Sequence, residues 1–366
     1  MKPKTDFKPF KVGTVFNPIK GGPYKVKPKL KEVKIKYPSR LNLMAIDPSK
    51  IATNRNLVYT PGEIILKVKI YKQVLARISN NQKRILISPI AKRPSLILHS
   101  ALLMKKALNF NCGLELNVDN SQELRHVGLG SSSGLIASVA CAINELFGKP
   151  ISPENLLQYL AQNHGEEIEN QPNFLSPVQC IGGSAASGLY KGALLVLAGQ
   201  SRVIRSMNLN GNYQVIIGIP KDFKEMDSKT LLKKELNVMN NFIKCGKKYG
   251  PLIAYKVLHS VLPAMAEEDL ATIGDVVFDY RYKMGSIKNC SYTYPKLVSL
   301  TNRLAFLKTK RLVDLLSISS VGPAIIAVSK DIGYAKEAFI KENLKVFITR
   351  PENSTYKILK KVIYEV

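Results

Sequence analysis

The sequence contains no tryptophan, only four histidines and half as many acidic as basic residues. No run of about 18 uncharged apolar residues occurs, which excludes an ordinary membrane-spanning helix. The first 36 residues carry 11 lysines but lack the apolar segment of a secretory signal. The five cysteines form no Cys-x-x-Cys pair, which favours free thiols in a reducing compartment. These absences predict a cytoplasmic protein.

The remaining composition is that of a globular protein with an excess of positive charge. The 366 residues are 45% hydrophobic and carry a net charge of +27. Such a charge fits nucleic-acid binding, attraction of a polyanionic small substrate, or a lysine-rich proteome. Because the lysines are spread along the chain and form no stripe with aromatic residues, nucleic acid is the disfavoured partner. Whether the protein forms a homodimer stays open.

Hydrophobic periodicity predicts separate blocks of strands and helices. Strands are expected at 33–37, 38–47, 63–71, 113–119, 193–198, 214–219, 324–328 and 345–349, and helices at 94–110, 135–147, 153–162 and 332–342. A further helical region should span 228–284, with a break near Gly250-Pro251. This order predicts an α+β fold and not repeated βαβ units. Residues 1–31, rich in Lys and Pro, are expected to form a basic, flexible arm.

A glycine- and serine-rich loop at residues 125–134, RHVGLGSSSG, is the most informative segment. Gly128 and Gly130 allow a tight turn and a close approach to a ligand. The helix that follows presents unpaired amides and its positive dipole end, which together favour a phosphate group. No Gly-Lys-Ser/Thr follows, so the loop is not a Walker motif. A plain helix cap is the alternative.

Each of the other candidate residues has both a functional explanation and an ordinary structural one. Asp47 lies at the end of an expected strand. It is either a magnesium ligand or a residue of the turn that follows. Arg40 offers a planar fork for carboxylate or phosphate, or forms a surface ion pair. His126 donates to phosphate or packs under the turn. His164, beside Glu166 and Glu167, fits an exposed helix end better than a metal or acid–base cluster, and His99 fits a core position.

Several short motifs resemble known families. The loop at 128–133 resembles the nucleotide-phosphate loop of the GHMP kinase superfamily. Five segments together resemble β-ribofuranosylaminobenzene 5′-phosphate synthase, a member with a kinase fold and a different reaction. These are 38–41 with 46–47, 126–131, 262–274, 319–323 and 349–353. Their order and spacing cover residues 33–356.

The resemblance implies a two-lobed α+β fold. Its N-terminal lobe, at 32–200, would be like ribosomal protein S5 domain 2, and its C-terminal lobe, at 201–366, would be ferredoxin-like. The implied enzyme joins 4-hydroxybenzoate or 4-aminobenzoate to C1 of phosphoribosyl pyrophosphate. Carbon dioxide and pyrophosphate leave, Mg²⁺ supports the pyrophosphate, and the product serves methanopterin-type cofactors. The partners would be the phosphorylated substrate and an aromatic acid.

The residues and the resemblance together predict a site. The phosphate cradle comprises Gly128, Leu129, Gly130, Ser131, Ser132, Ser133 and Gly134. Catalytic roles go to Asp47, Arg40 and His126, and substrate contacts to Ser319, Ser320, Gly322 and Arg350. Magnesium is expected at Asp47 and Ser132.

The chain also departs from the family pattern. Asn42 stands where the synthases commonly have histidine, and residues 54–63 replace their Gly-rich, Asp-containing stretch. Two alternatives therefore stay open, an ATP-dependent small-molecule kinase and a catalytically inactive binding protein of the same fold. The kinase alternative needs a carboxylate base, and residues 163–188 contain glutamates but no aspartate.

Overall fold

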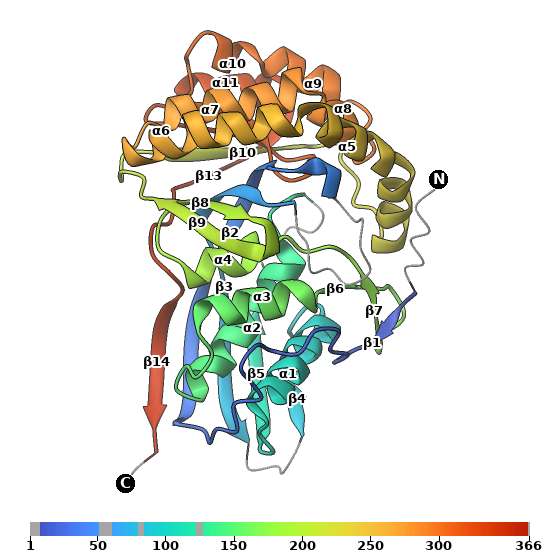
Figure 1. The fold of residues 1–366 in the computed structure, drawn as a ribbon, viewed down its shortest axis with the longest axis vertical. Coiled ribbons are helices and arrows are strands. Elements are labelled where there is room, and N and C mark those ends of the chain that lie inside the picture. The colour runs from blue at the N-terminus through green and yellow to red at the C-terminus, as the bar shows by residue number, and fades with distance from the viewer. Residues whose placement is uncertain (1–7, 51–60, 80–83, 122–126, 365–366) are drawn as a thin grey trace.

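The computed structural model describes residues 8–50, 61–79, 84–121 and 127–364. In this part of the chain an N-terminal lobe with a seven-stranded sheet lies against a C-terminal lobe with a four-stranded sheet (Figure 1). Strands and helices alternate in blocks, and almost all sheet pairs are antiparallel. The expected α+β class is confirmed.

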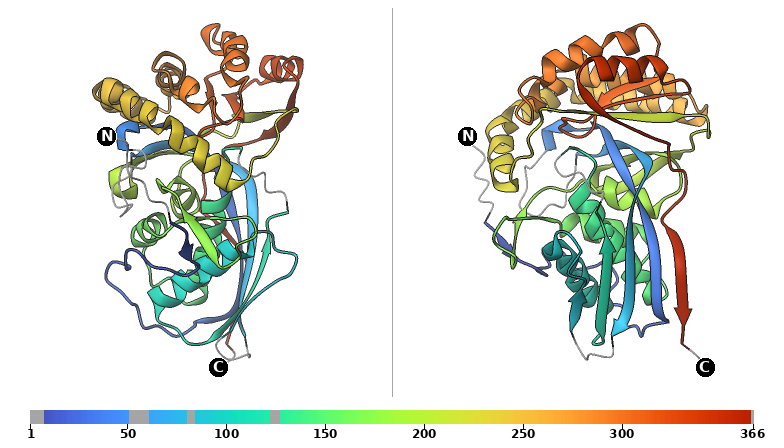
Figure 2. Two further views of the ribbon diagram at one scale, coloured as in Figure 1. Left: turned by 90° about the vertical axis from the view of Figure 1, so that its right-hand side faces the viewer. Right: turned by 180° about the vertical axis from the view of Figure 1, so that it is seen from behind.

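The N-terminal sheet carries its helices on one face and leaves the other face bare (Figure 2). Its strands are β2 (Leu30–Ala45), β3 (Glu63–Ser79), β4 (Ile85–Ile87), β5 (Gly113–Asp119), β8 (Leu194–Ala198), β9 (Arg202–Met207) and β14 (Lys357–Ile363). Its helices are α1 (Pro94–Leu108), α2 (Ser131–Leu146), α3 (Pro153–Gln162) and α4 (Gly183–Leu189). Val33, Ile35 and Tyr37 alternate along β2 and pack under these helices, as the period of two requires.

The C-terminal sheet, in the order β11-β12-β10-β13, is covered by the later helices. Its strands are β10 (Gln214–Pro220), β11 (Leu315–Ile318), β12 (Ile325–Ser329) and β13 (Leu344–Thr349). The helices are α5 (Ser228–Lys256), α6 (Leu262–Ala266), α7 (Leu270–Phe278), α8 (Ser286–Cys290), α9 (Leu297–Leu304), α10 (Phe306–Thr309) and α11 (Gly333–Lys341). The π-helical turns η3 (Val257–Val261) and η4 (Asp279–Lys283) extend α5 and α7. Short 3₁₀ turns lie at η1 (Pro48–Lys50) and η2 (Gly199–Ser201).

The two lobes share one hydrophobic core. Leu41 and Leu43 of β2 belong to the same buried cluster as Val215 and Ile217 of β10. The chain also crosses between the lobes, because β9 and β14 lie beyond residue 200 but pair with strands of the N-terminal sheet. The division at residue 200 stays a prediction, and these two strands show that the N-terminal lobe draws on both halves of the sequence.

The N-terminal segment packs more closely than the flexible arm that composition predicts. Within residues 8–31, β1 (Phe10–Lys11) pairs with β7 (Phe174–Pro177), which also pairs with β6 (Gly165–Glu167). The Gly13 amide donates to His99 Nδ1, and Phe16 and Asn17 amides donate to Asn163 Oδ1. His99 is fully buried and its Nε2 contacts the Asn163 carbonyl, so its expected core role is confirmed.

Most expected elements form near their predicted limits, with one clear correction. The helix expected to break near Gly250-Pro251 instead continues through Pro251 to Lys256. Proline removes one helical hydrogen bond and bends a helix, but it need not end it. The expected strands at 33–37 and 38–47 also join into the single strand β2.

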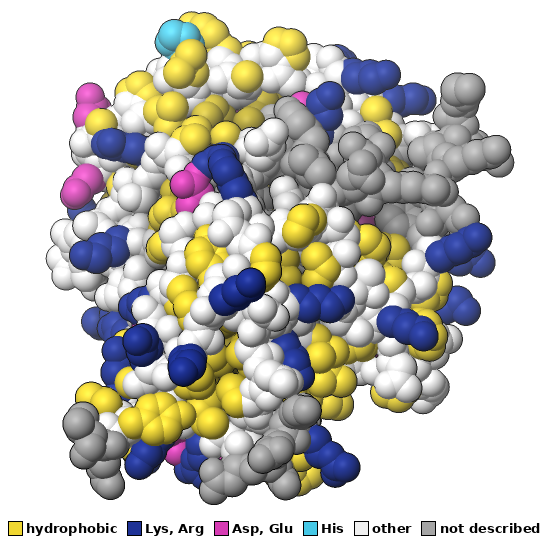
Figure 3. All heavy atoms as spheres, turned by 60° about the horizontal axis from the view of Figure 1, so that its bottom comes forward, with side chains coloured by type: hydrophobic (Ala, Val, Ile, Leu, Met, Phe, Trp, Pro, Cys, Tyr) yellow, Lys and Arg dark blue, Asp and Glu magenta, His cyan; other side chains and the backbone are white. Residues whose placement is uncertain are grey.

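The surface carries its positive charge in scattered positions. On the face drawn in Figure 3, Lys and Arg side chains are spread singly among apolar and uncharged ones, and acidic side chains are few. Among the described residues, no helix is long and apolar enough to cross a membrane.

Candidate functional site

The glycine-rich loop leads directly into α2, as predicted. Gly128 and Gly130 have φ values of 95° and 67°, which L side chains rarely adopt, and Gly130 is the N-cap of α2. The amides of residues 131–133 occupy the first turn, where helical amides lack partners within the helix. Gly134 differs from its predicted role: its amide donates to the Gly130 carbonyl at 2.9 Å, so it is committed to the helix. Phosphate binding at residues 128–133 stays a prediction.

Arg40 of β2 lies against this loop. Its NH1 donates to the Gly128 carbonyl at 3.0 Å, while its Nε is buried without a hydrogen-bond partner. A Cβ at Gly130 would stand 3.1 Å from the Arg40 guanidinium carbon. The guanidinium therefore lies beside the loop with one donor left for a ligand, and the alternative of a surface ion pair does not hold.

The turn at residues 319–322 joins the C-terminal lobe to the loop. Ser319 Oγ donates to the Gly128 carbonyl at 2.8 Å and accepts from the Asn42 amide at 3.1 Å. The Ser320 amide donates to the Asn42 carbonyl at 2.9 Å. Ser319 is buried and positions the loop, whereas Ser320 and Gly322 line the cavity.

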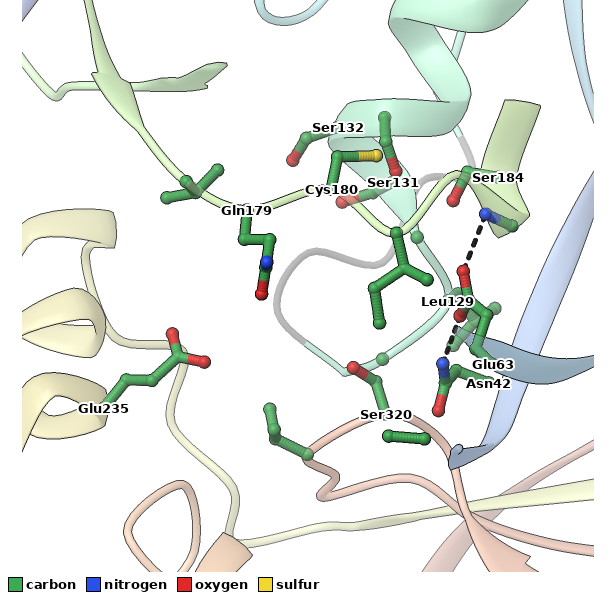
Figure 4. A pocket seen from close by; sticks show the side chains of 18 of the residues that line it. Asn42, Glu63, Leu129, Ser131, Ser132, Gln179, Cys180, Ser184, Glu235 and Ser320 are labelled. Carbon is green, nitrogen blue, oxygen red and sulfur yellow. Dashed lines mark hydrogen bonds between the residues drawn. The ribbon is translucent and has the colours of Figure 1, made fainter. Parts of the chain in front are cut away.

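These segments enclose one cavity of about 310 Å³ between the lobes. Its walls come from β2, the start of β3, the loop before α2, residues 178–184, α5, η4 and the 319–322 turn. Figure 4 shows the loop residues Leu129, Ser131 and Ser132 on one side and Ser320 below them. The cavity thus receives groups from three of the segments that the sequence singled out.

Glu63 is a cavity residue that the sequence analysis missed. Its carboxylate accepts from Asn42 Nδ2 and, at 2.7 Å, from the amide of Gly183 (Figure 4). Glu63 is only 1% exposed. The sequence offered one signal for Glu63, because this glutamate is the first residue of an otherwise apolar strand. A solvent-exposed residue is equally common at that position.

Ser132 and Glu166 form a second polar pair at the wall. Ser132 Oγ donates to Glu166, which also pairs with Arg93, and Arg93 Nε lies 3.5 Å from Glu167. In the described part of the chain, no three His, Cys, Asp or Glu residues gather as a metal cluster. Magnesium usually takes only one or two protein oxygens beside phosphate oxygens and water. Ser132 and Glu166 fit that pattern at the loop, and the predicted magnesium roles of Asp47 and Ser132 stay predictions.

His164 lines the cavity and is not an exposed helix end. It is 5% exposed, and burial lowers its pKa to about 4 against a smaller opposing effect of Glu166. Desolvation disfavours the charged imidazolium. His164 is therefore neutral at pH 7 and can offer one donor and one acceptor.

Two predicted residues do not line this cavity in the described structure. Asp47 Oδ1 accepts from the Ser49 amide at 3.0 Å, as its turn explanation expects, and its catalytic and magnesium roles stay predictions. Arg350 is exposed and lines a separate hollow of about 200 Å³ with Lys69 and Lys357. Arg350 follows the last residue of β13. It therefore lies at the end of the C-terminal sheet opposite to the 319–322 turn. His126 lies outside the described residues.

Comparisons with known proteins agree with this geometry. Residues 95–175 match the model of the GHMP kinases N terminal domain. The fold is that of the GHMP kinases. Homoserine kinase from Cytophaga hutchinsonii superposes with a TM-score of 0.59 at 17% identity, over 90% of this chain and 98% of that one. The mevalonate pyrophosphate decarboxylase of Streptococcus pyogenes gives 0.60 at 13% identity, over 89% and 98%.

A third structure extends the same likeness. Mevalonate kinase from L. major, solved in complex with R-mevalonate, gives a TM-score of 0.57 at 13% identity, over 90% of this chain and 99% of that one. No curated protein sequence matches the chain. The two-lobed GHMP arrangement expected from the sequence is therefore confirmed, while identities this low show the fold alone.

Proposed function

We propose that the protein is an enzyme that binds a phosphorylated small molecule at residues 128–133. More finely, we propose a Mg²⁺-dependent synthase that joins 4-hydroxybenzoate or 4-aminobenzoate to C1 of phosphoribosyl pyrophosphate. The observation that carries the proposal is that Arg40, residues 128–133 and residues 320–322 line the same cavity. These three segments belong to motifs that resemble the synthase and lie far apart in sequence.

Each group in the cavity has a role in such a reaction. The first amides of α2 cradle the pyrophosphate, because unpaired amides and the helix dipole favour an anion. The guanidinium of Arg40, which lines the cavity, donates to a phosphate or carboxylate oxygen. Ser132 and Glu166 would hold the magnesium ion, which neutralises charge on the departing pyrophosphate when bound. Glu63 faces the cavity as a carboxylate that can stabilise positive charge developing at C1.

A decarboxylation assay tests this proposal. Purified protein is incubated with phosphoribosyl pyrophosphate, Mg²⁺ and either 4-hydroxybenzoate or 4-aminobenzoate labelled in the carboxyl carbon. We expect labelled carbon dioxide from one or both acids, and none when the phosphoribosyl donor or the metal is left out. Absence of labelled gas from both acids in the complete mixture would contradict the synthase proposal.

A GHMP-type kinase is the second candidate, and Glu63 is the observation that favours it. The segment 163–188 lacks the aspartate that a kinase base would require, but Glu63 reaches that segment from β3 through the Gly183 amide. A buried carboxylate at this point can accept the proton of a substrate hydroxyl during phosphate transfer. The homoserine and mevalonate kinase likenesses agree with this candidate.

For a kinase, Glu63→Gln should lower kcat for phosphate transfer by roughly 10²-fold or more, because general-base catalysis typically contributes that much. The affinity for ATP should change little, since the amide keeps the shape of the side chain. Steady-state kinetics with a panel of small alcohols and calorimetry with ATP measure the two quantities. Glu267→Gln, at an exposed position, is the control. An unchanged kcat in Glu63→Gln would remove Glu63 as the base.

A further inference from the structure

One face of α5 closes the far end of the cavity. The residues of α5 that line it are three or four positions apart, so they share one helix face. They are Ser228, Leu231, Leu232, Glu235, Met239 and Phe242. Lys233 and Lys234, between them in sequence, point to solvent. Apart from Ser228 at the helix start, this wall is apolar with a single carboxylate in it.

The carboxylate of Glu235 points into the cavity from the side opposite Glu63 (Figure 4). Burial raises the pKa of Glu235 to about 7, against a smaller opposing effect of Tyr292. Among the described residues, no lysine or arginine pairs with it. A carboxylate on an apolar face without a cation costs free energy unless a donor meets it. The Tyr292 hydroxyl is one donor beside this carboxylate. The carboxylate also faces the cavity, where it can accept a second hydrogen bond from a ligand that brings a donor.

Arg281, another charged residue of the cavity wall, is already committed to hydrogen bonds within the protein. Arg281 of η4 lines the cavity, but its guanidinium donates to the Leu43 and Asn42 carbonyls and to Ser317 and Ser286. Tyr280, Cys290 and Val321 also line the cavity, and so does the amide side chain of Gln179. A ligand at this end would meet the apolar face of α5 and a carboxylate acceptor at Glu235.

We propose that the α5 end of the cavity is the acceptor subsite, and that it takes a small aromatic ring whose amino or hydroxyl group donates to Glu235. This inference rests on the proposed function, since it identifies where the aromatic acid of that reaction binds. Leu231, Leu232, Met239 and Phe242 contact the ring faces, and Glu235 selects rings that carry a donor. The phosphate loop lies at the other end of the same cavity, so both substrates fit side by side.

Binding of two matched acids tests the subsite without any turnover. Calorimetry compares 4-hydroxybenzoate with 4-methylbenzoate, in which a methyl group of similar size replaces the donor. Wild type should prefer 4-hydroxybenzoate by about tenfold or more, as expected for a hydrogen bond to a charged group. Glu235→Met should bind both acids equally, whereas Lys233→Met, on the exposed side of the same turn, should keep the wild-type preference. Pyrophosphate affinity should stay within about twofold of wild type in both variants, because the loop is untouched.

The preference should also depend on pH. It should be full at pH 8 and fall as the pH drops through 7, because the carboxylate is the stronger acceptor and is lost on protonation. The other titratable groups that face Glu235 do not change charge in this window. Burial raises the pKa of Tyr292 and raises that of Cys290 to about 11, and Arg281 stays charged. Glu235→Gln should make the preference independent of pH, and it also serves if Glu235→Met fails to fold.

The outcomes separate this inference from the proposed function. An undiminished preference in both Glu235 variants, or failure of wild type to bind either acid, overturns the subsite. A preference that depends on Glu235, in a protein that releases no carbon dioxide with phosphoribosyl pyrophosphate, supports the subsite and contradicts the synthase reaction. Release of carbon dioxide by a Glu235→Met variant with unchanged KM for the acid would overturn the subsite while the reaction stands.

Discussion

Replacing Gly130 with valine is expected to abolish measurable binding of pyrophosphate and phosphoribosyl pyrophosphate. Gly130 has a φ of 67°, where a β-branched residue is strained. A Cβ there would clash with Ser184 Oγ and come within 3.1 Å of Arg40 Nε. The loop or the guanidinium must move, so the amides of α2 and the Arg40 donor no longer converge on one anion. Loss of several charge-assisted contacts together should weaken binding by at least about a hundredfold.

The fold should survive this substitution. Backbone strain at one position costs about 1–3 kcal/mol, and the clash involves side chains at the cavity wall, not the core. Calorimetry with each anion gives the affinity, and thermal unfolding gives the stability. Ser133→Ala is the matched control in the same loop, because it keeps every backbone amide and should bind with nearly wild-type affinity. Normal anion binding by Gly130→Val would place the phosphate site elsewhere.

The sequence predicted the parts of the site that depend on backbone shape. A glycine pair followed by serines and a small-residue helix has few structural solutions, and α2 follows the glycines directly, although it begins at Ser131 and not at the expected residue 135. The turn at 319–322 was expected from the resemblance of residues 319–323 to a synthase motif. In the loop before α2, local chemistry decides the conformation.

The parts that depend on tertiary packing could not be predicted. Glu63 opens a strand and Glu235 lies on a lysine-rich helix, so both look like solvated residues until the lobes meet over them. Asp47 shows the converse, a carboxylate in a promising motif that caps its own turn. The basic composition of residues 1–31 predicts flexibility, but Phe10 and Ile19 are enough to anchor that segment in the core. Long-range contacts of a few residues outweigh composition in each case.

Replacing Arg281 with leucine should give the largest loss of stability among the substitutions considered. Arg281 is 2% exposed and its guanidinium makes four hydrogen bonds to β2, β11 and α8. The strongest, at 2.7 Å, goes to the Leu43 carbonyl. Leu43 is the extra residue where the β2–β3 register shifts between Asn42 and Met44, so its carbonyl lies at a β-bulge. Arg281 therefore satisfies a buried carbonyl at the irregular point of the central strand.

Leucine at this position leaves those acceptors buried without their donor, at about 1–3 kcal/mol for each unsatisfied group. Relief of the buried charge offsets part of this, since burial lowers the pKa of Arg281 and thus already disfavours the charged guanidinium. We expect the loss of the donors to dominate, because the Leu43 carbonyl would exchange the 2.7 Å bond from Arg281 for reliance on the longer 3.2 Å bond from Ser317 Oγ, and predict a net destabilisation of about 3 kcal/mol. The midpoint of denaturant-induced unfolding measures this loss of stability.

The control is Arg303→Leu, which breaks a 2.8 Å ion pair to Glu342 from an exposed side chain and should cost less than about 1 kcal/mol. Equal midpoints for the two variants would mean that Arg281 does not support the bulge, and that the cavity wall is held by the hydrophobic contacts between the lobes alone.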